Sequence, residues 1–377
     1  MYKRGTDNNG FRCWRRTKAS VSVVFAVVLA FVIAFEIYTF AVFYSDGYVK
    51  LPDNFGNFEH VRKILDNQDA KDHFSFVVVG DPRGLGTFED LISEVRGKPL
   101  SFMVVLGDFV SERTQEHHRF FKAECAEEYK LPFPVFFVAG NHEFHYGAAA
   151  DKQRATISLS DFESMYGPTN FSFKYGGCLF VIIRDLPSFT VDESIAFLQS
   201  VLSREAGKYN RAFVFAHLPL PVSADFDFDT CGPAEAGKLM GLLDQYKVDY
   251  FVAGDYHGYA RIKRKDTVYL VTGGGGASLE KHNKYCRFHH AVTITVDAES
   301  VSEQILFVKD SYDKGDVVER FAITELYPLL VGHGVLTVLA NLLMVSSFFM
   351  FLWKVRNPKE QVVGAELVKS SDTTSNK

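Results

Sequence analysis

Apolar residues in the middle of the chain fall into short runs that alternate with segments of helical spacing. Five continuous runs are rich in β-branched and aromatic residues, which is typical of buried strands: 76–79, 102–106, 135–138, 213–215 and 250–252. Helical spacing predicts helices at 58–65, 87–95, 115–129, 191–202 and 233–246. Further strands are predicted at 171–175, 179–184, 259–263, 268–272, 291–296 and 301–308. This order favours an α/β protein with two packed sheets covered by helices.

Two apolar stretches are much longer than these runs. Residues 20–44 are almost wholly apolar and contain one charged residue, Glu36, and residues 327–353 contain no Asp, Glu, Lys or Arg. A membrane-spanning helix needs about 20 apolar residues, so both predict transmembrane helices. The alternatives are a cleaved signal peptide and a buried core helix, but the first stretch is too long for a signal core. The predicted organisation is a tail at 1–19, a span at 20–44, a linker at 45–72, a domain at 73–310, a linker at 311–326, a span at 327–353 and a tail at 354–377.

Basic residues flank both spans on the side away from the domain. They are Lys3, Arg4, Arg12, Arg15, Arg16 and Lys18 before the first span and Lys354, Arg356 and Lys359 after the second. The positive-inside rule then predicts that both termini are cytoplasmic. The domain is therefore expected outside the cytoplasm, in the periplasm, a lumen or the cell exterior. Glu36 and His333 are at similar predicted depths, so we expect them to form a hydrogen bond between the spans.

The charge and cysteine content narrow the choice of partners. The chain has 41 Lys and Arg against 46 Asp and Glu, and nucleic acid is not an expected partner because its binding relies on basic side chains. Four of the five cysteines lie in the extracytoplasmic part, where a disulfide can persist. They are Cys125, Cys178, Cys231 and Cys286. Whether one pair forms a disulfide stays open.

Each of the five apolar runs is followed closely by Asp, Asn or His. The segments are Gly80-Asp81-Pro82-Arg83, Gly107-Asp108, Gly140-Asn141-His142-Glu143, Ala216-His217 and Gly254-Asp255-Tyr256-His257. One such residue is ordinarily a turn former. Five of them, all of types that bind metals, predict a site at the carboxyl edge of the sheets.

The order of these segments resembles the calcineurin-like metallophosphoesterases, whose pattern is GDxH, GDxx, GNH(D/E), a lone His and GHxH. The resemblance extends from Phe74 to Phe307. It implies a four-layer α/β/β/α sandwich, here flanked by two transmembrane helices. It also implies hydrolysis of a phosphomonoester or phosphodiester by a hydroxide held on two divalent cations. The oxygen-rich ligand set favours Mn or Fe, with Zn also compatible.

The resemblance also implies roles for individual residues. Asp108 matches the bridging ligand of the two cations. Asp81 and His257 match ligands of the first cation, and Asn141, His217 and Asp255 complete the second. His142 matches the histidine that contacts the phosphate or leaving group, and Glu143 is expected to orient it.

Two positions depart from the family pattern. Arg83 replaces the histidine of the first motif, GDxH, and a guanidinium cannot bind a cation. Asp255 replaces the first histidine of the last motif, GHxH. Three interpretations stay open: Arg83 binds the substrate phosphate beside two cations, Arg83 pairs with Asp255 and one cation or none binds, or the site is a relic.

His145, His289 and His290 are candidates for a replacement ligand. The run 273–276 of four glycines lacks the Lys-Ser/Thr of a phosphate loop and predicts a wide turn near the site.

Two functions follow from these observations. The first is a membrane-tethered, extracytoplasmic, metal-dependent phosphoesterase with catalytic residues His142, Glu143 and Arg83. Its substrate is a phosphoester, with lipid-linked phosphates included because the domain is anchored at both ends. The alternative is a catalytically silent binding or scaffold protein of the same fold, with zero or one metal.

Overall fold

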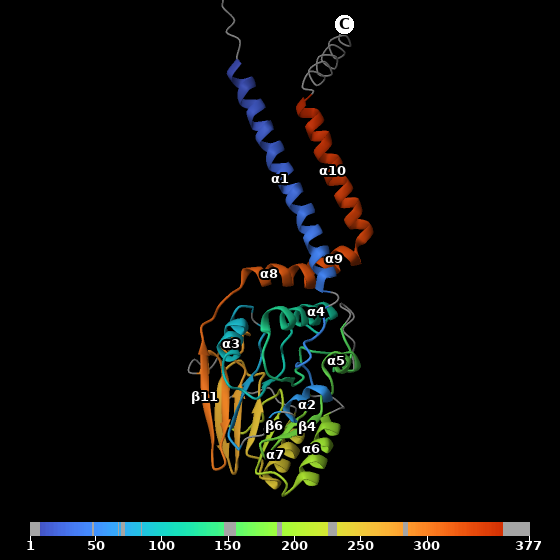
Figure 1. Cartoon of the computed structure of the whole chain (residues 1–377). Helices are drawn as coiled ribbons and strands as arrows, with labels where there is room; N and C mark the ends of the chain where they lie inside the picture. Colours follow the sequence, from blue (N-terminus) through green and yellow to red (C-terminus); the bar gives the residue numbers. More distant parts are fainter. Residues whose placement is uncertain are drawn as a thin grey trace, which may run out of the picture. The chain divides into compact units, whose positions relative to one another are not determined.

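The chain forms two compact units, shown in Figure 1. One unit comprises Ser45–Thr324, and the other comprises Met1–Tyr44 with Glu325–Lys377. The structure is a computed structural model, and it describes residues 8–46, 49–66, 68, 72–83, 85–146, 156–186, 191–224, 232–281 and 286–356.

The first sheet of the larger unit has five strands in the order β11-β10-β1-β2-β3. The strands are β1 (Phe74–Val79), β2 (Met103–Val105), β3 (Val135–Phe137), β10 (His289–Val296) and β11 (Val301–Val308). β1, β2 and β3 are parallel, whereas β10 is antiparallel to β1 and to β11. The loops after β1, β2 and β3 therefore leave the sheet at one edge.

The second sheet has six strands in the order β4-β5-β6-β7-β9-β8. They are β4 (Phe171–Tyr175), β5 (Cys178–Ile182), β6 (Arg211–Phe215), β7 (Tyr250–Ala253), β8 (Tyr259–Arg264) and β9 (Thr267–Thr272). The four central strands β5, β6, β7 and β9 are parallel, and the antiparallel strands β4 and β8 form the edges. The hairpin predicted around Gly176 and Gly177 is the β4–β5 connection.

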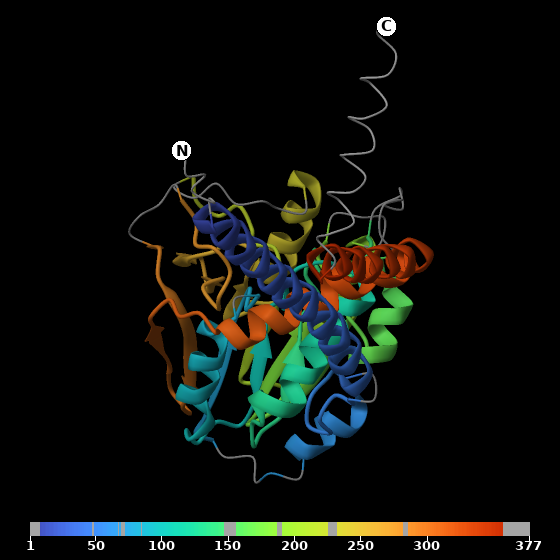
Figure 2. The ribbon, with the colours of Figure 1, turned by 90° about the horizontal axis from the view of Figure 1, so that it is seen from above.

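Successive residues of β1 belong to two different cores, which defines the layers. Phe76 packs between the sheets, with its ring centroid 5.5 Å from Phe180 and 5.4 Å from Phe213. Val77 points the other way, into a core that includes Leu91 of α3. Helices thus cover the outer faces of two sheets packed face to face (Figures 1 and 2), and the predicted four-layer sandwich is confirmed.

Helices and thiols of the larger unit agree in part with the sequence-based expectations. Its helices are α2 (Glu59–Asp66), α3 (Thr87–Arg96), α4 (Gln115–Glu124), α5 (Leu159–Tyr166), α6 (Val191–Glu205), α7 (Pro233–Gln245) and α8 (Lys314–Phe321). The helix predicted at 115–129 changes to a π-helix at Cys125–Tyr129, and a second π-helix, Ala322–Leu326, follows α8. Neither α5 nor α8 was predicted.

Cys125, Cys178 and Cys286 are free thiols, and Cys231 lies outside the described residues.

The smaller unit contains α1 (Asn8–Asp46), α9 (Tyr327–Gly332) and α10 (Gly334–Arg356). The segments Val23–Ser45 and Gly334–Trp353 are long and apolar enough to cross a membrane. α1 and α10 are in contact, with Phe25 and Phe348 stacked at a centroid distance of 5.9 Å.

The hydrogen bond predicted between Glu36 and His333 is wrong. Glu36 Oε2 instead accepts a hydrogen bond of 2.8 Å from Asn341 Nδ2. The reason is a break at His333, where α9 ends and a new helix begins at Gly334. The first six residues of the predicted span form the separate helix α9, which is inclined to α10 (Figure 1). The residue of α10 at the level of Glu36 is therefore Asn341, which lies eight positions after His333.

Candidate metal centre

Three aspartates at the ends of parallel strands share an unusual backbone conformation. Asp81 follows β1, Asp108 follows β2 and Asp255 follows β7, and their φ angles are 57°, 53° and 58°. Such left-handed residues reverse the chain direction tightly and concentrate at functional sites. Gly107 precedes one of these turns because a Cβ there would lie 2.6 Å from His217 Nδ1.

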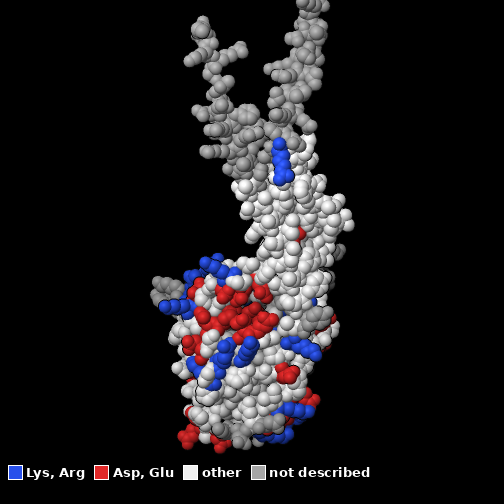
Figure 3. Space-filling model, turned by 45° about the horizontal axis from the view of Figure 1, so that its top comes forward, with Lys and Arg blue, Asp and Glu red and all other residues white. Residues whose placement is uncertain are grey.

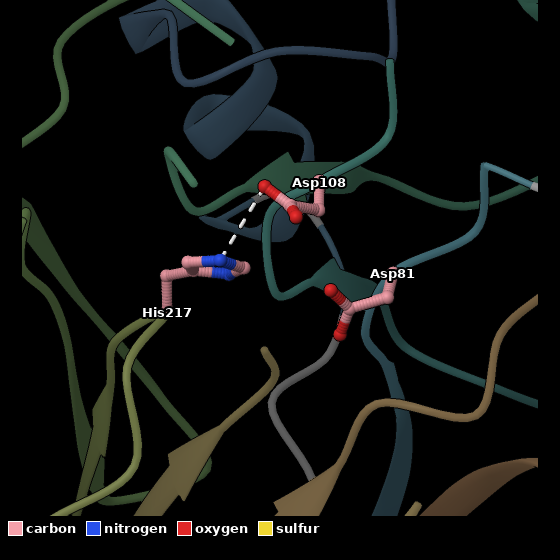
Figure 4. Close-up of side chains that lie close together, drawn as sticks. All are labelled: Asp81, Asp108 and His217. Carbon is pink, nitrogen blue, oxygen red and sulfur yellow. Dashed lines mark ion pairs between the residues drawn. The ribbon is translucent and has the colours of Figure 1, made fainter. Parts of the chain in front are cut away.

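Asp81, Asp108 and His217 converge at the edge of the two sheets (Figure 4). The relative exposures of the three residues are 0%, 1% and 0%. One ligand atom from each lies within 4.8 Å of the others. Two carboxylates buried this deeply require positive charge beside them.

Three polar side chains lie close to His217 Nε2. This nitrogen lies 3.0 Å from Asn141 Oδ1, 3.3 Å from Asp108 Oδ1 and 3.4 Å from Asp255 Oδ1. Atoms bound at about 2.0–2.2 Å to one ion lie about 3.0–3.5 Å from each other. The three distances from His217 Nε2 are compatible with one divalent cation at these four residues, the set that the sequence predicts for the second site.

The hydrogen bonding and the protonation of His217 support the same conclusion. His217 Nδ1 donates to the Leu106 carbonyl at 2.8 Å, which directs Nε2 toward the carboxylates. Burial opposes a charge on this ring, but Asp108, Asp255 and Asp81 outweigh it and raise the pKa of His217 well above its usual range. The side-chain amide of Asn141 lies 3.0 Å from this nitrogen. Positive charge is thus favoured between the His217 ring and the carboxylates.

The Arg83 guanidinium lies among the remaining candidate ligands. Its Nη2 is 3.0 Å from Asp108 Oδ2, 2.8 Å from His257 Nε2 and 4.0 Å from Asp81 Oδ1, and its Nη1 is 3.0 Å from His142 Nε2. The interpretation in which Arg83 pairs with Asp255 is therefore wrong, because its partner is Asp108. Of the residues offered for the first cation, His257 Nε2 and Asp108 Oδ2 are engaged by Arg83, whereas Asp81 Oδ1 lies 4.0 Å from the guanidinium and has no hydrogen-bond partner among the described residues.

Both histidines that contact Arg83 are held by backbone carbonyls. His142 Nδ1 donates to Ser111 O at 2.6 Å, and His257 Nδ1 donates to Ser278 O at 2.7 Å. Burial and the nearby guanidinium lower the pKa of His142, although Asp108 opposes this shift. His142 thus accepts from Arg83 as a neutral ring.

The resemblance implied that Glu143 orients His142, but the structure shows a different role for Glu143. Its carboxylate accepts hydrogen bonds from the backbone N–H groups of Asp108 at 2.9 Å, Phe109 at 2.9 Å and Gly140 at 2.6 Å. His142 is oriented by Ser111 instead. Glu143 therefore joins the loops after β2 and β3, because its buried carboxylate is the acceptor nearest to their unpaired N–H groups.

Two supporting residues were missed by the sequence analysis. Asp185 accepts from the N–H groups of His217 and Leu218 at 3.0 Å each. It follows the apolar run of β5, so the signal used for the other strand ends could have found it. His118 of α4 contacts the Glu143 carbonyl at 2.6 Å; it lies on a helix and carries no such signal.

The other candidate ligands lie elsewhere. His289 and His290 belong to β10, where their Nδ1 atoms contact the carbonyls of Gly274 and Phe288. His145 is half-buried in the loop after Glu143. The turn predicted at 273–276 packs against the first motif, since Gly275 N donates to Gly80 O at 2.8 Å.

Acidic side chains gather on one face of the molecule, as Figure 3 shows. The carboxyl groups of Glu89, Glu124 and Asp316 lie within 4.8 Å of one another. Burial, followed by repulsion from Asp316 and Glu89, raises the pKa of Glu124 to about 9. Glu124 is therefore protonated at neutral pH.

Residues 74–259 match the family model described as calcineurin-like phosphoesterase. The chain thus carries a domain of this family, as its motifs predicted. Its sequence matches no curated protein.

Three solved structures are among those that resemble the chain. A dimetal phosphatase from Danio rerio is 14% identical, with a TM-score of 0.48 over 63% of this chain and 97% of that one. A purple acid phosphatase from yellow lupin is 19% identical, with a TM-score of 0.46 over 66% and 55%. GAP50, the anchor in the inner membrane complex of Plasmodium, is 14% identical, with a TM-score of 0.44 over 67% and 95%.

Proposed function

We propose that the protein is a membrane-tethered phosphoesterase that hydrolyses a phosphomonoester or phosphodiester outside the cytoplasm with the help of a divalent cation. The observation that carries this proposal is the approach of Asp108 Oδ1, Asp255 Oδ1 and the Asn141 side-chain amide to within 3.0–3.4 Å of His217 Nε2. These four residues would hold the cation. A bound divalent cation supplies Lewis-acid stabilisation of phosphate charge and lowers the pKa of water. The oxygen-rich set favours Mn or Fe, and Zn is compatible.

Arg83 and His142 are the residues that would face the substrate. Arg83 Nη1 carries two N–H groups and donates one to His142, so the second is free to bind a phosphate oxygen. The guanidinium keeps its charge at every physiological pH and matches the geometry of phosphate. His142 and Asp108 hold the guanidinium from two sides, which limits its freedom before the substrate binds.

Anchoring and topology form the second part of the proposal. The two apolar helices and the basic residues outside them support a chain with both termini in the cytoplasm. A domain joined to a membrane at each end stays close to lipid head groups. A lipid-linked phosphate is therefore a suitable substrate, alongside soluble phosphoesters.

Hydrolysis by the full-length protein in detergent tests the proposal directly. An aryl phosphate and a bis-aryl phosphate are supplied with Mn²⁺, and release of the aryl alcohol is followed. We expect Asp108→Ala to lower the rate by about 100-fold or more, because it removes a ligand and not only a supporting group. Asp90→Ala on the exposed face of α3 is the matched control.

Equal rates for wild type and Asp108→Ala would refute the enzyme and favour the silent scaffold. If the aryl esters are poor substrates, a vesicle containing phosphatidic acid is used with the same pair of variants. Phosphate release that depends on Asp108 then supports the lipid-linked substrate class. Its absence with all three substrates contradicts the proposal.

A further inference from the structure

We propose that the guanidinium of Arg83 takes the place of one of the two cations that the family motifs imply, so that this centre holds a single divalent cation. The inference rests on the proposed function and specifies its metal content. It follows from which lone pairs Arg83 uses, and from the charge of the groups around it.

The histidine that matches a ligand of the first cation is already engaged. An imidazole nitrogen has one lone pair, and a carbonyl can only accept, so the bond to Ser278 O places the His257 proton on Nδ1. Arginine stays protonated and only donates. At 2.8 Å from Arg83 Nη2, His257 Nε2 must therefore be the acceptor. The same nitrogen cannot bind a cation while it accepts this bond.

The carboxylate that matches the bridging ligand is divided in the same way. Asp108 Oδ2 lies 3.0 Å from Arg83 Nη2, whereas Asp108 Oδ1 lies 3.3 Å from His217 Nε2, on the side of the proposed cation. Asp108 thus bridges a guanidinium and one cation site. This arrangement keeps a positive charge at both of its oxygens.

The charges of Arg83 and the three strand-end aspartates balance with one divalent cation; this count leaves out Glu143 and Asp185, whose carboxylates accept backbone N–H groups. Asp81, Asp108 and Asp255 carry three negative charges when ionised. One guanidinium and one divalent cation carry three positive charges.

Arg83 is also fixed at its backbone, so its position does not depend on the side chain alone. Its carbonyl oxygen accepts a hydrogen bond of 3.0 Å from Arg320 Nη1 in α8. The side chain is 17% exposed. A guanidinium held from both ends supplies fixed charge to the phosphate, but it cannot activate water as a Lewis acid does.

Metal content measured on the full-length protein tests the inference. Wild type, Arg83→His and the control Arg96→His, at an exposed position of α3, are saturated with Mn²⁺, desalted and analysed by inductively coupled plasma mass spectrometry. We expect one Mn²⁺ per chain in wild type and in Arg96→His, and two in Arg83→His. Electron paramagnetic resonance should show an isolated ion in wild type and a spin-coupled pair in Arg83→His.

Each outcome separates this inference from the proposed function. Two ions in wild type overturn the inference and leave the phosphoesterase proposal intact. No ion in wild type overturns the metal-dependent function itself. If Arg83→His does not fold, Arg83→Lys replaces it and is expected to keep one ion; two ions in Arg83→Lys would show that charge at position 83 does not exclude the second cation.

Discussion

The carboxylate of Glu143 accepts a hydrogen bond of 2.9 Å from the backbone N–H of Asp108, and this bond joins the loops at the ends of β2 and β3. The same side chain also accepts from Gly140, which precedes the ligand Asn141. Two candidate ligands are therefore positioned by one buried acid that contributes no lone pair to the cation. The spacing between Asp108 and Asn141 depends on Glu143.

Replacing Glu143 with Gln should disturb this support without changing its size. The amide nitrogen would face backbone N–H donors and leave at least one of them unpaired, which costs about 1–3 kcal/mol. We expect a lower melting temperature and a Mn²⁺ affinity reduced about 10- to 100-fold. Thermal unfolding and calorimetric titration measure the two effects, with Glu94→Gln on the exposed face of α3 as the control. Wild-type affinity in Glu143→Gln would contradict the supporting role.

Asp185→Asn tests the support of His217. Asp185 accepts from the N–H groups of His217 and Leu218, so the variant places an amide group against one of these donors. We expect about 10- to 100-fold weaker Mn²⁺ binding. The matched control is Asp192→Asn, whose ion pair with Lys238 is on the surface and contributes little. Equal dissociation constants for Asp185→Asn and wild type would exclude the role.

Much of the architecture could be predicted because the relevant signals are local. β4 and β11 have the predicted bounds, and each of the five apolar runs overlaps a strand. Strand ends bring Asp81, Asp108 and His217 together because parallel strands present their carboxyl ends at one edge. Sequence position alone therefore indicated which residues meet.

Other features depend on contacts that no local pattern encodes. The pairing of Arg83 with Asp108 reflects which carboxylate lies within reach of a long side chain. The donors to the Glu143 carboxylate are backbone N–H groups, which every residue except proline has, so residue types do not reveal these bonds. α5 is different, because Ser158 and Asp161 form a capping box that the sequence does contain.

The stability of the domain should depend on pH through Glu124. Its pKa is raised from 4.5 to about 9 in the fold, chiefly by burial and then by Asp316 and Glu89. A raised pKa means that the folded state holds the proton more tightly, so this contribution is complete below pH 4.5 and is lost as the pH rises toward 9. The free energy of unfolding should fall by up to about 1.4 kcal/mol per pH unit over this window.

Glu124→Gln removes the titrating group and keeps its shape. The variant should melt at a higher temperature than wild type at pH 8, and the difference should shrink toward pH 5. Melting temperatures of the full-length protein in detergent at several pH values measure this, with Glu94→Gln as the control. A difference that does not change with pH would show that Glu124 carries no shifted proton.

The contact between Glu36 and Asn341 leads to a prediction about the two apolar helices. Asn341 Nδ2 donates to Glu36 Oε2 at 2.8 Å, and Phe25 and Phe348 stack further along the same pair of helices. A carboxyl group in an apolar helix is costly without a partner, so this bond should fix the register of α1 and α10.

The double variant Glu36→Cys/Asn341→Cys should form a disulfide within one chain after oxidation in detergent or vesicles. Mass spectrometry of the linked peptides identifies the pair and distinguishes it from links made by the native cysteines. Glu36→Cys/His333→Cys is the control, because His333 lies at the break between α9 and α10. Cross-linking in the control but not in the Asn341 pair would restore the pairing with His333 and refute the register described for these helices.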